Sequence, residues 1–347
     1  MPDDPPPRAS WGAVLTAHEP AQLLLANVGW HIGTGAAEVH VYLDDPYDAV
    51  LPRLAAIPGV RAVACDDAHW RRVAPSGRRP PTHRRRQALN ANDALKQCSV
   101  DWLVHLDADE FLVQDSPHDR PLGAEMAAVR ELECELYFPV AERLYLTGPQ
   151  ASIWEGVFRT CTRSQIRRGD GIDNDRVIYG DHVDCLDFGV LGHSAGKCAV
   201  PVDGDFRLGI HWAFRGTGRR RAERFRSTAA RLLHFDGLTQ LQWLTKLRRY
   251  TEYDPADFSV AAHRQAQIDL AAEAGAVPGG HAALHDELKV VSPAAQARLR
   301  AFGLLYEVPF DPVPVLRRVL GEVPDFSVDA FDAELRRRLP ERTKGLP

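Results

Sequence analysis

The strongest constraint on the fold is a regular alternation of strand-like and helix-like segments in the first third of the chain. Short, continuous apolar runs predict buried strands, and the segments between them repeat apolar residues at helical spacing. The predicted strands are 11–17, 38–43, 60–65 and 102–106, and the predicted helices are 21–30, 51–57 and 87–97. This order predicts an α/β fold, with a mostly parallel, Rossmann-like sheet flanked by helices.

The rest of the chain has a different pattern. The middle, 134–212, is irregular, with strand-like pieces at 135–139 and 153–160, and helical patterning dominates after residue 222, notably at 238–250 and 255–274. We therefore expect three parts: a flexible leader at 1–10, a catalytic domain at 11–250 and a helical C-terminal extension at 251–347.

Composition narrows the class of protein. The chain has 347 residues, 45% of them hydrophobic and 26% charged, which is typical of a globular protein. Its net charge of −5 argues against a nucleic acid as partner. The six cysteines form no C-x-x-C pair, so we expect reduced thiols. With no signal peptide and no apolar run long enough to span a membrane, we expect a cytoplasmic protein, and peripheral membrane contact stays open.

Acidic residues follow two of the predicted strands. Asp44 ends the second strand, and Asp107-Ala108-Asp109-Glu110 follows the fourth. Ligands of open α/β sheets bind outside the carboxyl ends of the strands, where both groups fall. Carboxylates directly after a buried strand need a partner, and a hard divalent cation such as Mg²⁺ or Mn²⁺, shared with substrate phosphates, would serve. The alternative is an acidic loop that caps the next helix.

The segment Trp102–Leu112, WLVHLDADEFL, resembles the W-(hydrophobic)-D-x-D-E-F-(L/I) signature of glycosyltransferase family 2-like enzymes with the GT-A fold. Further segments are similar to other blocks of bacterial members of this group. They are 14–19, 30–35, 41–45, 86–87, 193–197, 209–212 and 232–237. The resemblance covers roughly residues 11 to 250 and is strongest at the D-x-D block.

The resemblance implies a metal site on the D-x-D motif. Asp109 would bind Mn²⁺ or Mg²⁺, with Asp107 acting through water or the ribose, and Glu110 would orient these ligands from behind. The cation would neutralise the nucleoside diphosphate as it leaves. GT-A enzymes often add a histidine ligand from a later segment. His211 is the first choice and His234 the second, and for each the alternative is a core histidine bonded to backbone.

The same resemblance implies a nucleotide-sugar site. Contacts to base and ribose would come from residues that follow the first two strands, and basic residues would neutralise the diphosphate. The residues expected at the nucleotide are Thr16, His18, Glu19 and Asp44, with Asp107 through the ribose, and those expected at the phosphates are Arg86 and Lys197. For each basic residue the alternative is an ordinary solvated side chain, and for Asp45 the alternative to a nucleotide contact is a turn with Pro46.

We expect an inverting transfer, which needs a general base for the acceptor hydroxyl. The downstream acids are Asp187, Asp205 and Asp236, and we take Asp236 first and Asp187 second as catalytic candidates. The family's usual Glu-Asp base motif is not evident here. Two basic runs, 71–86 and 215–221, are solvated faces, or in the second case a lid over the diphosphate.

The sequence thus predicts a metal-dependent glycosyltransferase that moves a sugar from UDP or GDP to a carbohydrate or lipid-linked acceptor in surface-polysaccharide assembly. One alternative is a nucleotidyltransferase or metal-dependent phosphohydrolase. These enzymes usually carry a glycine-rich loop or a nucleophilic Asp after the first strand, where this chain has Thr16-Ala17-His18-Glu19. Another alternative is a nucleotide-sugar-binding module without catalysis.

Overall fold

The predicted first strand becomes the centre of the main sheet in a computed structural model that describes residues 7–162, 174–252 and 259–347. β1 (Trp11–Ala17) pairs in parallel with β2 (Glu38–Leu43) on one side and β4 (Trp102–His105) on the other. Nearly every residue of these strands is buried, so their apolar runs are explained by burial of both sheet faces. The first six residues of the predicted leader lie outside the described ranges.

The sheet has seven strands in the order β12-β6-β9-β4-β1-β2-β3. Four of the six neighbouring pairs are parallel, and β9 runs antiparallel to both of its neighbours. The remaining strands are β3 (Val60–Ala64), β6 (Glu135–Phe138), β9 (Lys197–Pro201) and β12 (Arg224–Arg226). The prediction of a mostly parallel sheet is confirmed.

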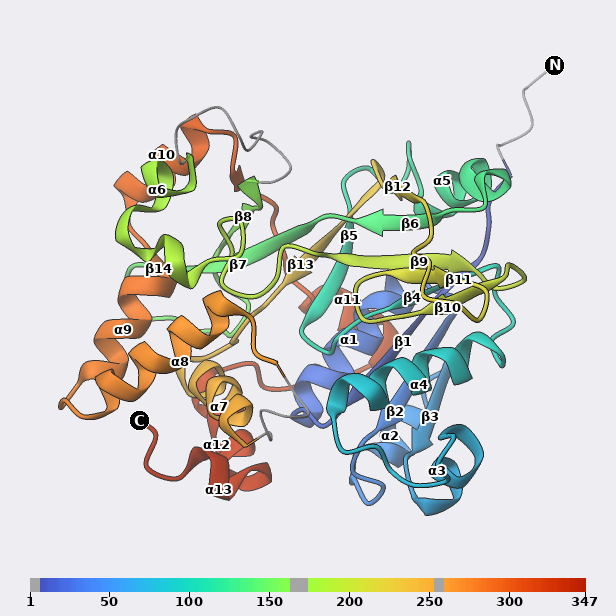
Figure 1. Ribbon diagram of the computed structural model, residues 1–347, viewed down its shortest axis with the longest axis horizontal. Helices are drawn as coiled ribbons and strands as arrows, with labels where there is room; N and C mark the ends of the chain where they lie inside the picture. The colour runs from blue at the N-terminus through green and yellow to red at the C-terminus, as the bar shows by residue number, and fades with distance from the viewer. Residues whose placement is uncertain (1–6, 163–173, 253–258) are drawn as a thin grey trace. The chain divides into compact units, whose positions relative to one another are not determined.

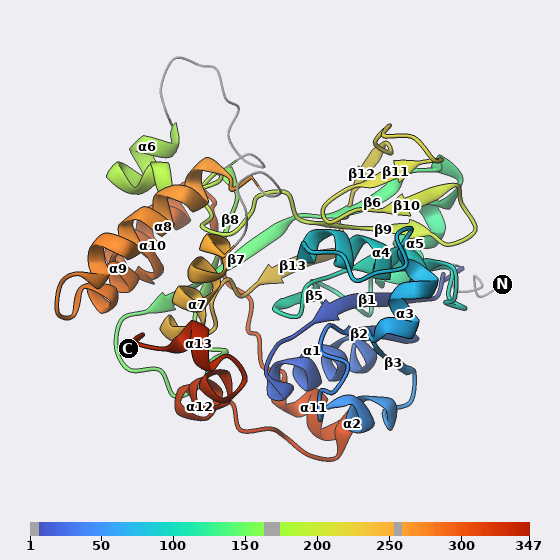
Figure 2. The same cartoon turned by 60° about the horizontal axis from the view of Figure 1, so that its bottom comes forward.

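Helices cover both faces of this sheet (Figures 1 and 2). On one face, Ala91 and Ala94 of α4 (His83–Leu95) share a core with Val14 and Leu103. On the other face, α1 (Ala21–Gly33) contacts β2 and β5. The α/β prediction is confirmed, and the arrangement is consistent with a Rossmann-like GT-A fold.

By internal contacts the chain divides into two compact units, each assembled from several segments. Unit 1 consists of 1–139, 195–232 and 312–324, and unit 2 consists of 140–194, 233–311 and 325–347. We predicted a catalytic domain at 11–250 and an extension at 251–347, and this assignment of catalysis to the first part stays a prediction. The other elements of unit 1 are α2 (Leu51–Ala55), α3 (Asp67–Val73), β5 (Glu110–Gln114), α5 (Leu122–Val129), η1 (Arg130–Leu132), β10 (Phe206–Leu208), β11 (Ala213–Arg215) and α11 (Val313–Leu320).

Unit 2 combines a small antiparallel sheet with helices. β7 (Val140–Leu146) pairs with β8 (Val157–Thr160), and β8 pairs with β15 (Leu305–Tyr306). β13 (Ala230–His234) crosses the boundary between the units in the sequence. The remaining elements are α6 (Asn174–Tyr179), η3 (Gly180–Cys185), α7 (Gln240–Thr251), α8 (Ala262–Gly275), α9 (Gly280–Lys289), β14 (Val290–Val291), α10 (Pro293–Ala301), α12 (Val328–Arg338) and α13 (Pro340–Thr343).

The C-terminal part is helical, as predicted, apart from the two-residue strands β14 and β15. The start of the helix predicted at 255–274 falls partly on residues outside the described ranges, and α8 begins at Ala262. All six cysteines are free thiols, as expected. Across the described ranges we find no helix with the length and apolar character needed to cross a bilayer.

Two side chains of α1 fix the middle of β5, just after the acidic segment. The Trp30 indole donates to the Leu112 carbonyl at 2.8 Å. His31 accepts from the Leu112 N–H through Nε2 at 3.1 Å, and its Nδ1 donates to the Asn27 carbonyl at 2.8 Å. These two bonds require the neutral ring. Burial, only partly offset by the bond to Asn27, lowers the pKa of His31 to about 4.

The close packing of α1 against α11 predicts a cost for filling Gly29. A Cβ at Gly29 would lie 2.3 Å from Leu316 Cδ2, and Leu316 is fully buried. We expect Gly29→Val to lower the free energy of unfolding by about 2 kcal/mol through overpacking, measured by urea denaturation. The control is Gly218→Val, whose nearest neighbouring atom is 3.9 Å away, with an expected change within about 0.5 kcal/mol. Equal effects of the two changes would contradict the packing argument.

The buried neutral His31 predicts a loss of stability in mild acid. Its pKa is lower in the folded chain than in the unfolded chain, so below pH 6.5 the unfolded chain takes up a proton that the folded chain takes up only near pH 4. The contribution to the free energy of unfolding falls across this window by about 3 kcal/mol. Denaturation at pH 7, 6 and 5 should give a shallower decline for His31→Gln than for wild type. His118→Gln, at an exposed histidine, should decline like wild type.

Candidate functional site

The acidic segment after β4 is a tightly bonded turn at the carboxyl end of the parallel strands. The Asp107 N–H donates to Glu110 Oε2 at 2.7 Å, and the Glu110 N–H donates to the Asp107 carbonyl at 3.1 Å. From α1, the Asn27 amide donates to the carbonyls of Asp107, Ala108 and Glu110 at 3.4, 3.1 and 2.8 Å. The backbone that carries the predicted metal ligands is therefore fixed from both sides before any ligand binds.

Lys197 is a fully buried cation at the start of β9, and it faces this turn. Its Nζ lies 2.8 Å from Asp107 Oδ2 and 3.4 Å from Glu110 Oε2. Burial alone would lower the pKa of Lys197, but the two carboxylates raise it above its ordinary value, so the lysine stays charged. We predicted Lys197 at the diphosphate, and the structure places it on the carboxylates of the D-x-D-E segment.

The two predicted metal ligands differ in exposure. The Asp107 side chain keeps 27% of its surface exposed, and its second oxygen, Oδ1, accepts from the Gln87 amide of α4. Asp109 is 7% exposed. Glu110 was predicted to orient the metal ligands. Its side chain is fully buried, and its carboxylate accepts a hydrogen bond from the Asp107 N–H. The roles of the three acids toward a metal stay predictions.

Asp44 lies on the same edge of the sheet, directly after β2. Its N–H donates to the Ala17 carbonyl at the end of β1, at 2.9 Å. Arg79 and Arg86 contact its two oxygens, at 2.7 and 2.8 Å. Arg86 is nearly buried and also donates to the carbonyls of Pro80 and Pro81. In this arrangement Arg86 orients Asp44, and Arg79, about half exposed, is the more accessible cation.

The other residues predicted at the nucleotide follow β1. The Thr16 hydroxyl accepts from the Asn90 amide at 3.0 Å. His18 and Glu19 lie half-buried in the short connection between β1 and α1, again at the carboxyl edge. Thr16, Asp44 and Asp107 therefore belong to three adjacent parallel strands or their ends, as the sequence predicted.

Two histidines of unit 1 each bond a backbone carbonyl through Nδ1. His211, the first choice as metal ligand, donates from Nδ1 to the carbonyl of Gly196 at 3.0 Å, so Nε2 carries the lone pair that a metal would need. His105, which we did not predict, is buried and donates from Nδ1 to Gly209 at 2.7 Å. Burial, with the Lys197 charge, lowers the pKa of His105 to about 4, so it is neutral. Whether His211 binds metal stays a prediction.

The sequence did not predict that Asn27 binds the backbone of the acidic turn, nor that Gln87 binds Asp107. Asn27 is a buried amide on an otherwise apolar face of α1, a position where an unbonded polar group would be costly. This was the available signal that it binds backbone. Gln87 stands beside Arg86 in the sequence, and its one-residue offset turns it toward Asp107.

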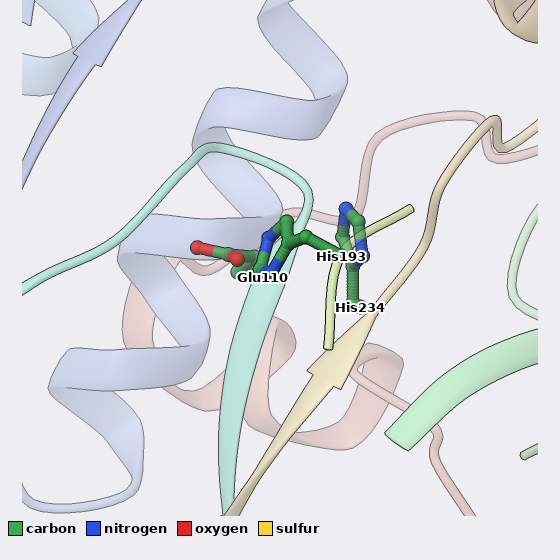
Figure 3. A group of neighbouring side chains, drawn as sticks. All are labelled: Glu110, His193 and His234. Atoms are coloured by element: carbon green, nitrogen blue, oxygen red, sulfur yellow. The ribbon is translucent and has the colours of Figure 1, made fainter. Parts of the chain in front are cut away.

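In unit 2, the second-choice metal ligand His234 lies at the end of β13 and is buried. Its ring lies 4.8 Å, between centroids, from the ring of His193, with the two planes tilted by 30° (Figure 3). Their ligand nitrogens lie within 4.8 Å of one another, which is compatible with a divalent metal. His193 belongs to a segment that resembles a family block, but we did not predict it as a ligand.

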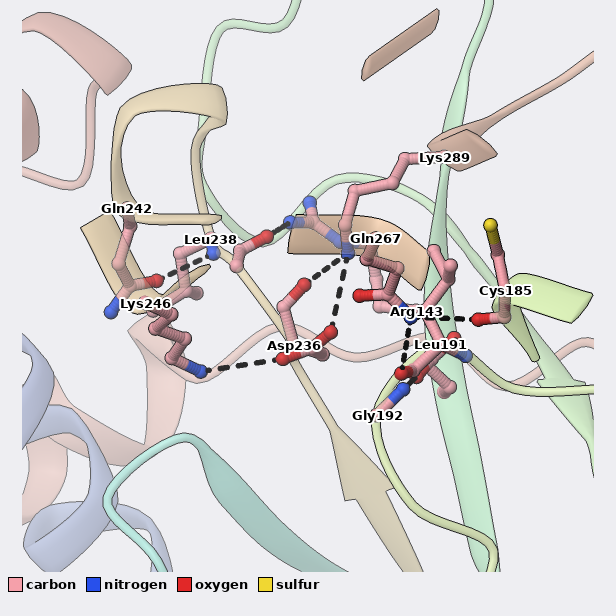
Figure 4. A network of polar contacts seen from close by, with 12 residues as sticks. Arg143, Cys185, Leu191, Gly192, Asp236, Leu238, Gln242, Lys246, Gln267 and Lys289 are labelled. Atoms are coloured by element: carbon pink, nitrogen blue, oxygen red, sulfur yellow. Dashed lines mark hydrogen bonds and ion pairs between the residues drawn. The ribbon is translucent and has the colours of Figure 1, made fainter. Parts of the chain in front are cut away.

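Asp236, the first candidate for the general base, is buried among three cations of unit 2, two of which, Lys246 and Lys289, are labelled in Figure 4. Its carboxylate oxygens lie 3.7 Å from Lys246 Nζ, 3.5 Å from Arg264 Nη1 and 3.9 Å from Lys289 Nζ. Burial would raise the pKa of Asp236, but these cations, Arg264 first, lower it well below its ordinary value. Such a carboxylate has little affinity for a proton, which argues against Asp236 as a base.

Asp187, the second candidate, lies in a short loop of unit 2. Its Oδ2 accepts from the Ser194 N–H at 2.7 Å, and its backbone pairs with Val190. The side chain is half-buried, and no cation contacts its carboxylate in the part of the chain that the structure describes. The catalytic roles of both acids stay predictions.

Comparison with known proteins adds little. No protein-family model and no curated protein matches the chain. Among solved structures, 4-diphosphocytidyl-2C-methyl-D-erythritol synthase is similar at 12% identity over 41% of this chain and 66% of that one, with a TM-score of 0.23. Glucosyl-3-phosphoglycerate synthase from Mycobacterium tuberculosis, with Mn²⁺, UDP-glucose and phosphoglyceric acid, is similar at 16% identity over 56% and 57%, with a TM-score of 0.25.

The same synthase with Mn²⁺, UDP and phosphoglyceric acid is similar at 15% identity over 56% of each chain, with a TM-score of 0.25. This chain therefore spans less than two thirds of the length of each of these proteins. At these TM-scores the likenesses carry no argument about the site, which has to be argued from the residues themselves.

Proposed function

We propose that the chain is a metal-dependent glycosyltransferase. Unit 1 binds a nucleoside-diphosphate sugar, with UDP or GDP as the nucleotide, at the carboxyl edge of β1, β2 and β4. The sugar passes to a carbohydrate or lipid-linked acceptor, with inversion at the anomeric carbon, in the assembly of a surface polysaccharide. The proposal rests on the D-x-D-E segment and its surroundings in unit 1.

The observation that carries the proposal is the position of the Asp107 carboxylate at the end of β4. Lys197 and Gln87 each hold one of its oxygens, in a segment whose other two acids, Asp109 and Glu110, are buried. Carboxylate oxygens, shared with substrate phosphates, are the ligands that Mg²⁺ and Mn²⁺ take in proteins. Asp107 supports this assignment because its carboxylate is fixed in place and still partly exposed.

In this proposal Asp107 and Asp109 hold the cation through carboxylate oxygens, which suit Mn²⁺ and Mg²⁺. When bound, the cation supplies positive charge to a diphosphate leaving group. Glu110 and Asn27 keep the turn in one conformation, and Lys197 limits the repulsion among the acids. His211, through Nε2, is a further ligand candidate in unit 1.

The carboxyl edge also offers partners for the nucleotide. Asp44 is held by two arginines and is positioned to accept from a base N–H or a ribose hydroxyl. We assign the diphosphate contact to Arg79 in preference to Arg86, because Arg79 is about half exposed and Arg86 bonds two backbone carbonyls. Thr16, His18 and Glu19 complete the proposed nucleotide contacts.

For the proton of the acceptor hydroxyl we favour Asp187 over Asp236. A base must have appreciable affinity for a proton at working pH, and the three cations around Asp236 remove most of that affinity. Asp187 accepts one backbone N–H and is half-buried. We give Asp236 a structural role in unit 2 instead.

The alternatives are a nucleotidyltransferase or phosphohydrolase, and a binding module without catalysis. Against the first stands the connection after β1, where Thr16-Ala17-His18-Glu19 contains no glycine for a phosphate-binding loop and no nucleophilic Asp. The second differs from a transferase only in turnover, so slow hydrolysis of a UDP- or GDP-sugar would exclude it.

Nucleotide binding should depend on metal and on the D-x-D acids. Isothermal titration with UDP and GDP should detect binding of one of them with Mn²⁺ and weaker binding without it. Asp107→Asn and Asp109→Asn should each weaken the metal-dependent part by at least about tenfold, the scale of one lost charged contact. Asp45→Asn is the matched control at the same edge, since an amide oxygen can still accept from the Tyr47 N–H. Metal-independent binding that both variants retain would refute the proposal.

Substitutions of the two candidate bases should differ in whether they reduce turnover or stability. Asp187→Asn keeps the acceptor for Ser194 and should fold normally, while its kcat falls by at least about 100-fold. Asp236→Asn removes the buried carboxylate that Lys246, Arg264 and Lys289 share and should lower the free energy of unfolding by about 3 kcal/mol or more. Asp205→Asn, at an exposed acid, should change neither kcat nor unfolding. Full turnover by Asp187→Asn would exclude Asp187 as the base.

A further inference from the structure

We infer that His193 and His234 of unit 2 form a built pair of imidazole ligands for a divalent transition metal. The inference stands on unit 2 alone, so it holds whether or not a nucleotide-sugar binds to unit 1. It adds His193, which the function proposed above does not use, and it specifies the kind of metal.

The two rings have a separation that suits shared coordination. Their centroids are 4.8 Å apart, the planes are tilted by 30°, and one nitrogen of each ring lies within 4.8 Å of the other (Figure 3). Two nitrogens at about 2.1 Å from one metal lie about 3 to 4 Å apart, depending on the angle between them. Small side-chain rotations would therefore bring both nitrogens to one ion.

The loop that carries His193 is fixed on both sides of the histidine. The buried Glu142 carboxylate accepts from the N–H groups of Leu191 and Gly192, at 2.8 and 2.6 Å, and Arg159 holds the same carboxylate at 2.8 Å. On the other side, the Ser194 N–H donates to Asp187 at 2.7 Å. The backbone at His193 thus has little freedom to move its ring away.

Two helical side chains support the same loop from α8. His263 donates from Nε2 to the Gly192 carbonyl at 2.9 Å, and Gln267 donates to the carbonyls of Leu191 and Cys185 at 2.9 and 2.7 Å. Gly192 also packs directly on the second histidine: a Cβ there would lie 2.5 Å from His234 Cε1. Only glycine therefore permits this approach of the loop to the His234 ring.

His234 is fixed by the residues that follow it. The Gly237 carbonyl accepts from Arg143 at 2.7 Å and from the Tyr145 hydroxyl at 2.8 Å. Lys289 donates to the Asp236 carbonyl (Figure 4), and the Asp236 carboxylate lies among Lys246, Arg264 and Lys289. Two loops far apart in the sequence are thus each anchored by buried charged groups, and the feature that they present to each other is a pair of imidazoles.

This arrangement is that of a preorganised ligand pair with supporting carboxylates. Glu142 Oε2 and His234 Nδ1 both lie against Gly192, 3.0 and 2.8 Å from where its Cβ would stand, and buried carboxylates behind metal-binding histidines are typical of metal sites. Imidazole nitrogens favour Co²⁺, Cu²⁺ and Zn²⁺ over Mg²⁺. The pair therefore predicts a protein that discriminates against Mg²⁺, which carboxylates alone would not do.

Titration of the full chain with Co²⁺, followed by its visible absorption, tests the pair. We expect His193→Gln and His234→Gln each to raise the Kd for Co²⁺ by at least about tenfold, while His118→Gln, at an exposed histidine, binds like wild type. Competition with Mg²⁺ should be weak in wild type and should become effective in the two variants. Co²⁺ binding that is the same in wild type and both variants would overturn the inference.

A second measurement on the unchanged protein guards against variants that fail to fold. With one equivalent of Cu²⁺, electron spin echo envelope modulation (ESEEM) spectroscopy gives the number of imidazoles bound to the ion. Two imidazoles are expected, and one or none would overturn the inference. Neither readout needs a nucleotide, so failure here and failure of the UDP and GDP titrations are distinguishable.

Discussion

The buried ion pair between Lys197 and the D-x-D-E segment is the interaction on which the candidate site depends. Three acids directly after a buried strand would repel one another, and a fully buried lysine would be costly alone. Together they hold Asp107 at the carboxyl edge of the sheet, with Glu110 bonding the backbone behind it. Asp107 is thereby held in place while about a quarter of its side chain stays exposed, which is what the proposed binding of a divalent cation requires.

The sequence predicted the centre of the sheet well because the signal there is local. β1, β2 and β4 are buried on both faces, so continuous apolar runs mark them, and the acids that end them stand out by contrast. Asp44 and Asp107 were placed correctly at the carboxyl ends of the two strands that flank β1 for this reason. The chemical roles of Asp44 and Asp107 depend on residues that are distant in the sequence, and the local sequence pattern carries no information about these.

What the sequence could not supply was long-range pairing. β9 inserts antiparallel between β4 and β6 and brings Lys197 to Asp107, 90 positions earlier in the chain. Nothing local to Lys197 distinguishes it from a solvated lysine. Asp236 is the converse case: its residue type suggested a base, and Lys246, Arg264 and Lys289 converge on it from three separate helices and lower its pKa. The residue type determines which chemical roles a side chain can have, and the charges around it determine which of those roles is available.

The same reasoning applies to the C-terminal part, which looks like an appendage in the sequence. The chain passes between the two units at 139, 194, 232, 311 and 324, so neither unit is a continuous piece. α11 returns to unit 1 and buries Leu316 against Gly29 of α1, the helix whose Asn27 holds the acidic turn. α8 and α9 supply Arg264 and Lys289 to Asp236. A chain ending at residue 250 would lose these contacts, so residues after 250 belong to the support of the candidate site in unit 1 and of the histidine pair in unit 2.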